Sequence, residues 1–319
     1  DLSQYGGPSA TPTIDAAGDR LFTLSTDGDL QAWNLREKGR RLWCVNLYDA
    51  YRMPKRPHVC DRNPNDYGCT SAPLLVGGQL LVEVGASEGL VMAFDPSSGK
   101  RLWASEAREP AGHTGGIVPF RGPAGDALAV LALTNLVVIR RDAGHVGQTF
   151  ARQEWRTDFA CNIPCPAAVA SGRFLLTSGY NHKTVAAFDL AADGSFTPAW
   201  ETRETHAVVT TPVVCGGRAY VMGGALACLD MADGRLLWRG GQFGHGSMLA
   251  TSDDKLLAFG NGRLALVDIA PGASVYTELA RIDIGTPDTC YPHIALSDGL
   301  ITCKDRAGNI VILDLKVAK

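Results

Sequence analysis

Residues Ala225 to Trp238, ALACLDMADGRLLW, contain the pattern that decides the fold. Side chains up to Asp230 alternate between two faces with a period of two, as they do in a strand. The pair Asp233-Gly234 tolerates positive φ and therefore suits a tight turn. Trp238 then ends the return strand with a large apolar side chain. The stretch predicts a β-hairpin.

Variants of this hairpin recur along the whole chain. Each variant has a short apolar strand that ends in Asp or Asn, and the seven strand ends are Asn34, Asp95, Asp142, Asp189, Asp230, Asp268 and Asp314. Successive ends are 38 to 61 residues apart, and a spacing of ~45 residues is typical of propeller blades. The sequence therefore predicts an all-β fold, a β-propeller of four-stranded antiparallel blades. We count seven repeat units, or eight blades if an upstream unit precedes this chain.

Composition favours one globular domain over residues 1–319. Of the 319 residues, 45% are hydrophobic, which is enough for a large core. The formal net charge is −3, and 30 basic and 33 acidic residues are interspersed. This balance offers no basic surface for a phosphate backbone, so we expect no nucleic-acid partner. No run reaches the ~18 apolar residues of a membrane span, so we expect no transmembrane segment.

Residues 48–69 interrupt the repeat between the first two units. The stretch contains Pro54, Pro57 and Pro64, and it accounts for the longest step in the spacing. Long irregular connections of this kind run over the surface of compact domains. We therefore expect a surface insertion.

Nine cysteines are many for a protein of a reducing compartment. Cys60 and Cys69 enclose the polar loop CDRNPNDYGC, where a disulfide would restrict the chain, and we predict that bridge. Cys161 and Cys165 in FACNIPCP are either a second bridge or two unlinked thiols. The other cysteines lie in apolar, strand-like runs and are expected to be buried small residues.

Large aromatic residues close most units at the outer strand. They are Trp43, Trp103, Trp155, Trp200 and Trp238, with Tyr276 in the sixth unit. Their regular recurrence indicates packing between blades and argues against a ligand cage. Asp95, Asp189 and Asp230 end strands and are expected to accept backbone N–H groups of turns. The seventh unit has three strands, and Asp1 to Tyr5 is the candidate for a fourth beside Ile310 to Leu315.

Two stretches, AFDPSSGKRLW (93–103) and CLDMADGRLLW (228–238), resemble the repeat of pyrroloquinoline-quinone-type, or quinoprotein-like, propellers. Each combines a strand that ends in Asp, a turn that contains Gly, and a basic residue followed by Trp. The resemblance covers nearly the whole chain and is closest to bacterial members that are not dehydrogenases, which include an outer-membrane assembly lipoprotein. It implies an exported protein, periplasmic or secreted, although this chain carries no signal peptide. Such relatives often have eight blades.

The quinone cofactor itself is not expected. Dehydrogenases of the resembled family are much longer, clamp the cofactor with a disulfide between adjacent cysteines, and hold calcium in the funnel. This sequence has no Cys-Cys pair, and its tryptophans belong to the outer-strand repeat. We therefore expect no cofactor and do not expect PQQ.

Polar residues recur in the segments that join one unit's outer strand to the next unit's inner strand. These segments open on one face of a propeller, and the candidates for a ligand site at its channel mouth are His113, Asn162, His206, His245, Tyr291 and His293. Neutral imidazoles from different blades could bind a divalent metal or an anionic ligand. Alternatively, each residue caps a strand or bonds its own loop. None has a local spacing such as His-x-x-x-His, so we assign no metal.

The repeat and the shortage of catalytic signals favour a non-catalytic binding or assembly scaffold. The sequence has no His-Glu-x-x-His motif and no phosphate loop. A scaffold of this kind would bind a protein partner or a small ligand at a propeller face. The alternative is an enzyme or redox module whose ligand or metal site is the histidine-bearing channel mouth.

Overall fold

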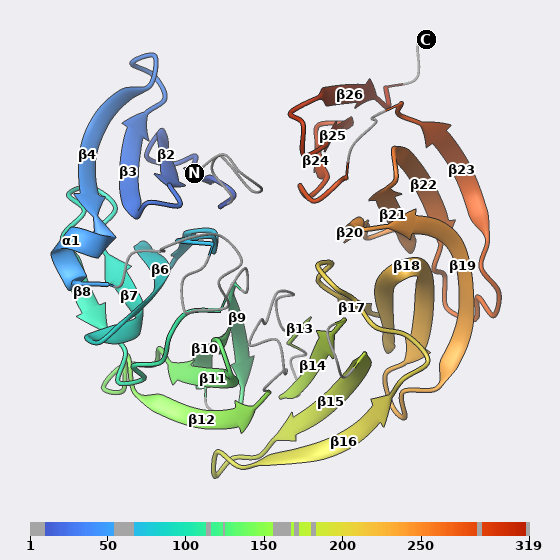
Figure 1. The fold of residues 1–319 in the computed structure, drawn as a ribbon, viewed down its shortest axis with the longest axis horizontal. Helices are drawn as coiled ribbons and strands as arrows, with labels where there is room; N and C mark the ends of the chain where they lie inside the picture. Colours follow the sequence, from blue (N-terminus) through green and yellow to red (C-terminus); the bar gives the residue numbers. More distant parts are fainter. Residues whose placement is uncertain are drawn as a thin grey trace. The chain divides into compact units, whose positions relative to one another are not determined.

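The fold is a seven-bladed β-propeller of four-stranded antiparallel sheets, as predicted (Figure 1). The computed structural model describes residues 10–53, 67–112, 116–123, 125–155, 167–168, 172–179, 183–285 and 289–316. Contacts divide the chain into two compact units, residues 1–174 with 189–197 and residues 175–188 with 198–319. The single domain over residues 1–319 stays a prediction. No helix of the described part is long and apolar enough to cross a membrane.

Three complete sheets lie in the first unit. Strands β1 to β4 of the first sheet are Thr13–Asp15, Arg20–Leu24, Asp29–Asn34 and Arg40–Asn46. Strands β5 to β8 of the second are Leu74–Val76, Gln79–Ala86, Gly89–Phe94 and Arg101–Ala104. Strands β9 to β12 of the third are Ile117–Gly122, Gly125–Leu131, Asn135–Arg140 and Thr149–Glu154. A short helix α1, Leu47–Tyr51, follows β4.

The fourth sheet has strands in both units, and the second unit contains the remaining three sheets. Strands β13 to β16 are Ala167–Ala168, Arg173–Ser178, Thr184–Leu190 and Phe196–Thr202. Strands β17 to β19 are Val213–Cys215, Arg218–Asp230 and Leu236–Gly244. Strands β20 to β23 are Gly246–Ala250, Lys255–Gly260, Arg263–Asp268 and Glu278–Asp283. Strands β24 to β26 are Ala295–Ser297, Leu300–Lys304 and Ile310–Asp314.

Element β18 corresponds to the second and third strands of the fifth blade, which form a hairpin without an interruption in strand structure. A backbone hydrogen bond from Met231 N to Gly217 O joins its two ends, as the bond from Leu190 N to Gly172 O does in the fourth sheet. The chain reverses near Gly224, whose φ of +102° suits glycine. The seventh sheet has three strands among the described residues. Asp1 to Tyr5, predicted to complete it, lies outside the described residues.

Apolar faces of successive sheets pack together and form the core. In the first unit, Phe22 and Leu30 of the first sheet share a cluster with Leu80 and Phe94 of the second, and all four are fully buried. Similar clusters join the second sheet to the third, the fifth to the sixth and the sixth to the seventh. The alternating apolar positions of the repeat therefore stabilise the fold between blades.

Five sheets have a β-bulge at the same place between the third and the outer strand, and the residue pair just before it joins a large side chain to a smaller one. In three of these sheets the tryptophan pairs with a small residue of the third strand, and the pairs are Ala32–Trp43, Ala93–Trp103 and Cys228–Trp238. In the other two sheets a larger residue pairs with alanine, and the pairs are Val138–Ala151 and Leu266–Ala280. The larger side chain of the pair thus lies on the outer strand in three sheets and on the third strand in two. In each sheet the pair has one larger and one smaller member, which suits close packing.

Trp155 and Tyr276 do not occupy this outer-strand position, so their predicted equivalence to the other tryptophans is wrong. Ala151 and Ala280 occupy it instead. In these two sheets the bulky member of the pair lies on the third strand, as Val138 and Leu266, and the outer strand has alanine there.

The two end residues of the predicted insertion 48–69 are part of the core, and the surface position of the segment between them stays a prediction. Tyr48 and Cys69 are 4% and 5% exposed and pack in the cluster of the first two sheets. Tyr48 Oη and Cys69 N both donate to Thr26 O at 3.1 Å. These two bonds fix both ends of the segment to one carbonyl, while residues 54–66 lie outside the described residues.

Cys69 has a free, buried thiol in this structure, unlike the predicted Cys60–Cys69 bridge. Its side chain lies in the apolar cluster beside Tyr48, and burial raises the pKa of the thiol to about 12. Cys60 and the pair Cys161 and Cys165 lie outside the described residues.

Thiol labelling should separate Cys69 from the exposed Cys44. At pH 8 a thiol with a pKa of about 12 is ~10⁻⁴ thiolate, so native Cys69 should resist iodoacetamide. Cys44 should be labelled without denaturant, and Cys69 only after unfolding, as read by peptide mass spectrometry. A Cys60–Cys69 linked peptide in a non-reduced digest would contradict the free thiol.

Candidate functional site

Four of the six predicted ligand residues lie in the described part of the chain, all in the second unit. His206, His245, Tyr291 and His293 each precede the inner strand of a sheet, as expected from the repeat. His113 and Asn162 lie outside the described residues.

His245 occupies the single position between strands β19 and β20, and both neighbours are glycines that need to be glycines. A Cβ at Gly244 would lie 2.5 Å from Asn261 Oδ1, and one at Gly246 would lie 1.9 Å from Phe259 O. The backbone on each side of His245 therefore packs directly on the sixth sheet. This close approach fixes the direction in which the imidazole leaves the chain.

The structure brings His245 together with Tyr291. Their ring centroids are 6.0 Å apart and the ring planes are inclined by 38°. Ser247 in β20 fixes the segment that carries Tyr291, because its Oγ accepts the N–H of Ile294 at 3.0 Å and donates to Pro292 O at 3.4 Å. Two linkers that are 46 residues apart in sequence thus present one aromatic pair.

His206 lies in a linker that is tightly fixed by its neighbours. Ala207 N donates to Thr177 Oγ1 at 2.9 Å, and Thr177 Oγ1 donates to Thr184 O at 3.1 Å. The carbonyl of His206 lies where a Cβ at Gly223 would be, only 1.7 Å away. The backbone of this predicted site residue is therefore held in place by two strands of the fourth sheet and one of the fifth.

Two of these histidines favour the neutral imidazole. Desolvation, followed by the nearby Lys183 ammonium, lowers the pKa of His206 below its ordinary value. Desolvation likewise lowers the pKa of His293. Such side chains offer one hydrogen-bond donor and one acceptor without a charge. In the part of the chain that the structure describes, no group of three or more His, Cys, Asp or Glu residues could hold a metal.

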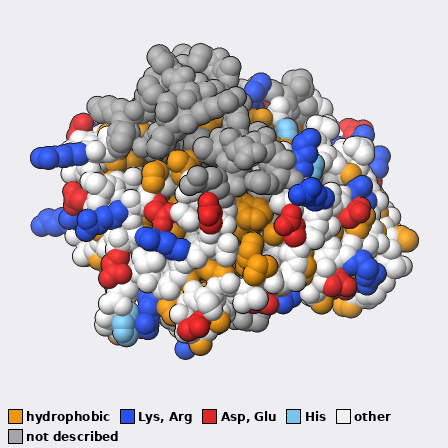
Figure 2. Space-filling view, turned by 60° about the horizontal axis from the view of Figure 1, so that its bottom comes forward, with side chains coloured by type: hydrophobic (Ala, Val, Ile, Leu, Met, Phe, Trp, Pro, Cys, Tyr) orange, Lys and Arg blue, Asp and Glu red, His pale blue; other side chains and the backbone are white. Residues whose placement is uncertain are grey.

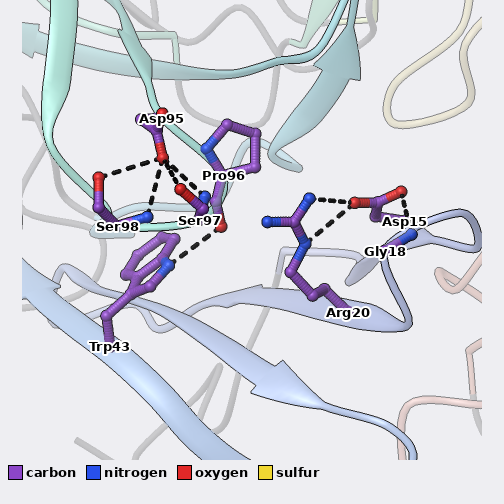
Figure 3. A network of polar contacts seen from close by, with 8 residues as sticks. All are labelled: Asp15, Gly18, Arg20, Trp43, Asp95, Pro96, Ser97 and Ser98. Atoms are coloured by element: carbon purple, nitrogen blue, oxygen red, sulfur yellow. Dashed lines mark hydrogen bonds and ion pairs between the residues drawn. The ribbon is translucent and has the colours of Figure 1, made fainter.

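Two outer-strand tryptophans dock on the next sheet in the same way. Trp43 Nε1 donates to Pro96 O at 3.1 Å (Figure 3), and Trp200 Nε1 donates to Met231 O at 3.0 Å. Each acceptor directly follows the aspartate that ends a third strand. The predicted packing of these two residues between blades is confirmed.

A glycine in each docking turn makes room for the indole. A Cβ at Gly99 would lie 2.7 Å from Trp43, and a Cβ at Gly234 would lie 2.4 Å from Trp200. Both glycines also have positive φ, 70° and 74°. Asp95 Oδ1 accepts the N–H groups of Ser97 and Ser98 at 2.8 and 2.9 Å, so its predicted role in the turn is confirmed.

Arg20 and Asp15, which were not predicted as site residues, lie beside the docking turn that receives Trp43 (Figure 3). Arg20 Nε and Nη2 both bond to Asp15 Oδ2, at 3.0 and 2.6 Å, and Gly18 N donates to Asp15 Oδ1 at 3.0 Å. Leu75, Gly78 and Pro96 face Arg20 across a cleft and lie 55 to 76 residues later in the chain, so no local motif could have shown it. The only signal was Arg at the start of a second strand, which recurs as Arg173 and Arg218.

Glu83 is a buried carboxyl group in the centre of β6 and is 2% exposed. Ser71 Oγ donates to its Oε2 at 2.6 Å, and Gly112 N donates to its Oε1 at 2.9 Å. Desolvation raises the pKa of Glu83 to about 7, although both hydrogen bonds oppose that shift. The side chain links the chain before β5 to the chain after β8.

Residues 85–89, GASEG, have the Gly-x-Ser-x-Gly spacing of a serine-nucleophile turn. That turn joins a strand to a helix in hydrolases. Here the stretch connects β6 to β7, two strands of one antiparallel hairpin, and Ser87 is exposed. The spacing is therefore a coincidence of the hairpin turn.

Comparison with known proteins gives one family. The family model described as outer membrane protein assembly factor BamB matches residues 1–195 and 145–278. BamB from Moraxella catarrhalis is similar in structure, with a TM-score of 0.63 and 12% identity over 95% of this chain and 84% of that one. The Cps50 (Swd1) propeller domain of Myceliophteria thermophila is also similar, with a TM-score of 0.56 and 13% identity over 98% of both chains. The search among curated proteins found no match.

Proposed function

Because the chain belongs to the family of the outer membrane protein assembly factor BamB, we propose that it is a non-catalytic scaffold that binds a polypeptide partner. We place it in the periplasm, where such a partner would take part in the assembly of outer-membrane proteins. The quinone cofactor has no role in this proposal.

The observation that carries the proposal is the rigid presentation of His245 and Tyr291. Their rings come from two separate linkers, and the glycines around His245 and the bonds of Ser247 hold the backbone of both linkers in place. Tyr is enriched at protein interfaces, and a fixed aromatic pair loses little conformational entropy on binding. The pair suits packing against another protein better than it suits proton transfer.

The charge distribution supports a protein partner. On the face that Figure 2 shows, basic and acidic side chains are interspersed among apolar ones. The net charge of −3 agrees with this mixture. Recognition on such a surface depends on shape and on individual hydrogen bonds more than on long-range attraction.

Replacing His245 and Tyr291 together by alanine should reduce assembly of outer-membrane proteins without unfolding the chain. The variant is expressed in the source organism in place of the wild-type chain, and outer-membrane β-barrel proteins are quantified by mass spectrometry. Levels should fall towards those of a deletion strain, because the contact surface is lost. Val146→Ala, at an exposed turn of the third sheet, serves as the control and should keep wild-type levels.

Two results would contradict the proposal. One is a deletion strain with unchanged outer-membrane proteins. The other is purified protein with a stoichiometric metal that is lost on mutating His206 and His245, because that would favour the enzyme or redox alternative.

A further inference from the structure

A cleft lies between the first two sheets of the first unit, beside the docking turn of Trp43 (Figure 3). Its volume is about 420 Å³, within the range of small-ligand sites. Its walls are Ala17 and the Asp15–Arg20 pair from the first sheet, and Leu75, Gly78 and Pro96 from the second. A Cβ at Gly78 would meet no atom within 4 Å, so that side of the cleft is open.

Arg20 offers this cleft a hydrogen-bond donor that it does not use elsewhere. Its Nε and Nη2 are occupied by Asp15 Oδ2. Figure 3 shows the third guanidinium nitrogen pointing away from Asp15, on the side of Pro96. Within the described ranges, no residue accepts a hydrogen bond from this Nη1. An arginine at the same strand position, Arg173, differs because it bonds to both carboxylate oxygens of Asp189.

The donor is held in place before any ligand arrives. The side chains of Arg20 and Asp15 are 22% and 11% exposed, and the guanidinium carbon lies 5.9 Å from the centre of the Phe22 ring. The N–H of Gly18 fixes the other oxygen of Asp15. A bond to Nη1 therefore requires little reorganisation of the protein.

The charge of the site selects the class of ligand. The hydrogen bond from Arg20 lowers the pKa of Asp15, so the carboxyl group is ionised and neutralises the guanidinium. A phosphate or carboxylate bound at Nη1 would gain little net attraction and would lie near the Asp15 carboxylate. A neutral acceptor, such as a peptide carbonyl, is not repelled by the Asp15 carboxylate.

We propose that this cleft binds an extended, uncharged segment of a polypeptide. A backbone carbonyl of the segment accepts the N–H of Arg20 Nη1, and a small apolar side chain lies against Leu75 and Pro96. The proposal rests on the proposed function in taking a polypeptide as partner, but it concerns residues other than His245 and Tyr291.

The test uses a pooled library of hexapeptides without Lys, Arg, Asp, Glu or His, each N-acetylated and C-amidated. Binding to the full chain is followed by NMR of the labelled Leu75 methyl groups and the Arg20 side chain. The blocked library should give saturable shifts at both residues. The same library with free carboxyl termini, and inorganic phosphate, should bind at least tenfold more weakly.

Two variants test the cleft independently. Ala17→Phe fills the space from an exposed position, and Arg20→Lys keeps the pairing with Asp15 but loses the planar Nη1 donor. Each should weaken the best peptide of the library at least tenfold. Arg173→Lys is the matched control, because Arg173 has a similar exposure of 25% and the same strand position, and it should change affinity less than twofold.

Three outcomes would overturn the proposal: no saturable shift with the blocked library, tighter binding of the anionic probes, or unchanged affinity in Ala17→Phe. The variant with alanine at both 245 and 291 should bind the peptides like the wild type. Unchanged outer-membrane proteins in that double variant would therefore count against the proposed function alone. Unchanged peptide affinity in Ala17→Phe would count against the cleft alone.

Discussion

Trp43→Ala is expected to lower the free energy of unfolding by about 2–4 kcal/mol, since it removes a half-buried indole from between two sheets. The variant loses the bond to Pro96 O and the packing on Gly99. Chemical denaturation monitored by circular dichroism measures the loss. Trp43→Phe should retain most of the packing and lose about 1 kcal/mol with the hydrogen bond.

The glycine on the other side of this contact provides a control within the same fold. Gly99→Ala places a Cβ against Trp43, whereas Gly39, in the matching turn of the first sheet, has φ of +75° and no atom within 4 Å of a Cβ. Gly39→Ala should cost about 1 kcal/mol from backbone strain alone. Gly99→Ala should cost about 2 kcal/mol more, and that excess should disappear when Trp43→Ala is combined with it. Equal costs in the two glycine variants would contradict the docking role.

Glu83→Gln should abolish a pH dependence of stability that the wild-type chain shows between pH 4.5 and 7. The folded pKa of about 7 lies above the ordinary value of 4.5, so the folded state binds the proton more tightly. Stability is therefore fully present below pH 4.5 and falls as pH rises to 7, by about 3 kcal/mol in all. The amide keeps a partner for Gly112 N and carries no charge, so above pH 7 the variant should be the more stable protein.

Denaturation curves at several pH values measure this effect. Cys69 is a buried titratable group near Glu83, and its thiol stays neutral across this range because its pKa is about 12. Glu106→Gln is the control, because Glu106 is exposed and accepts a backbone N–H from Thr149 at 3.0 Å. It should keep the wild-type slope. A Glu83→Gln variant with that same slope would show that Glu83 does not titrate in this window.

The blades could be predicted from the sequence because their signals are local. Alternation, turn glycines and strand-ending aspartates all act over a few residues, and Asp95 and Asp230 behave as expected. Trp155 and Tyr276 were misplaced because the bulky residue of the pair can lie on either strand. Only the register of the paired strands shows that Ala151 and Ala280 face Val138 and Leu266.

The site residues show the same division. The linkers of His206, His245 and Tyr291 follow from the repeat, but the meeting of His245 with Tyr291 depends on two segments far apart in the chain. Glu83 lies in LLVEVG, where one charged residue in an apolar run reads as a solvent-facing position. The strand is buried on both faces, which only the packing of neighbouring sheets could show.

The docking of Trp43 and Trp200 on the following sheet also orders events in time. The carbonyl that receives Trp43 lies 53 residues later in the chain, and the one that receives Trp200 lies 31 residues later. The indole of a completed outer strand therefore stays uncovered until the next sheet has formed. Folding intermediates with the first sheet formed and the second unformed expose this apolar surface and are open to non-native contacts.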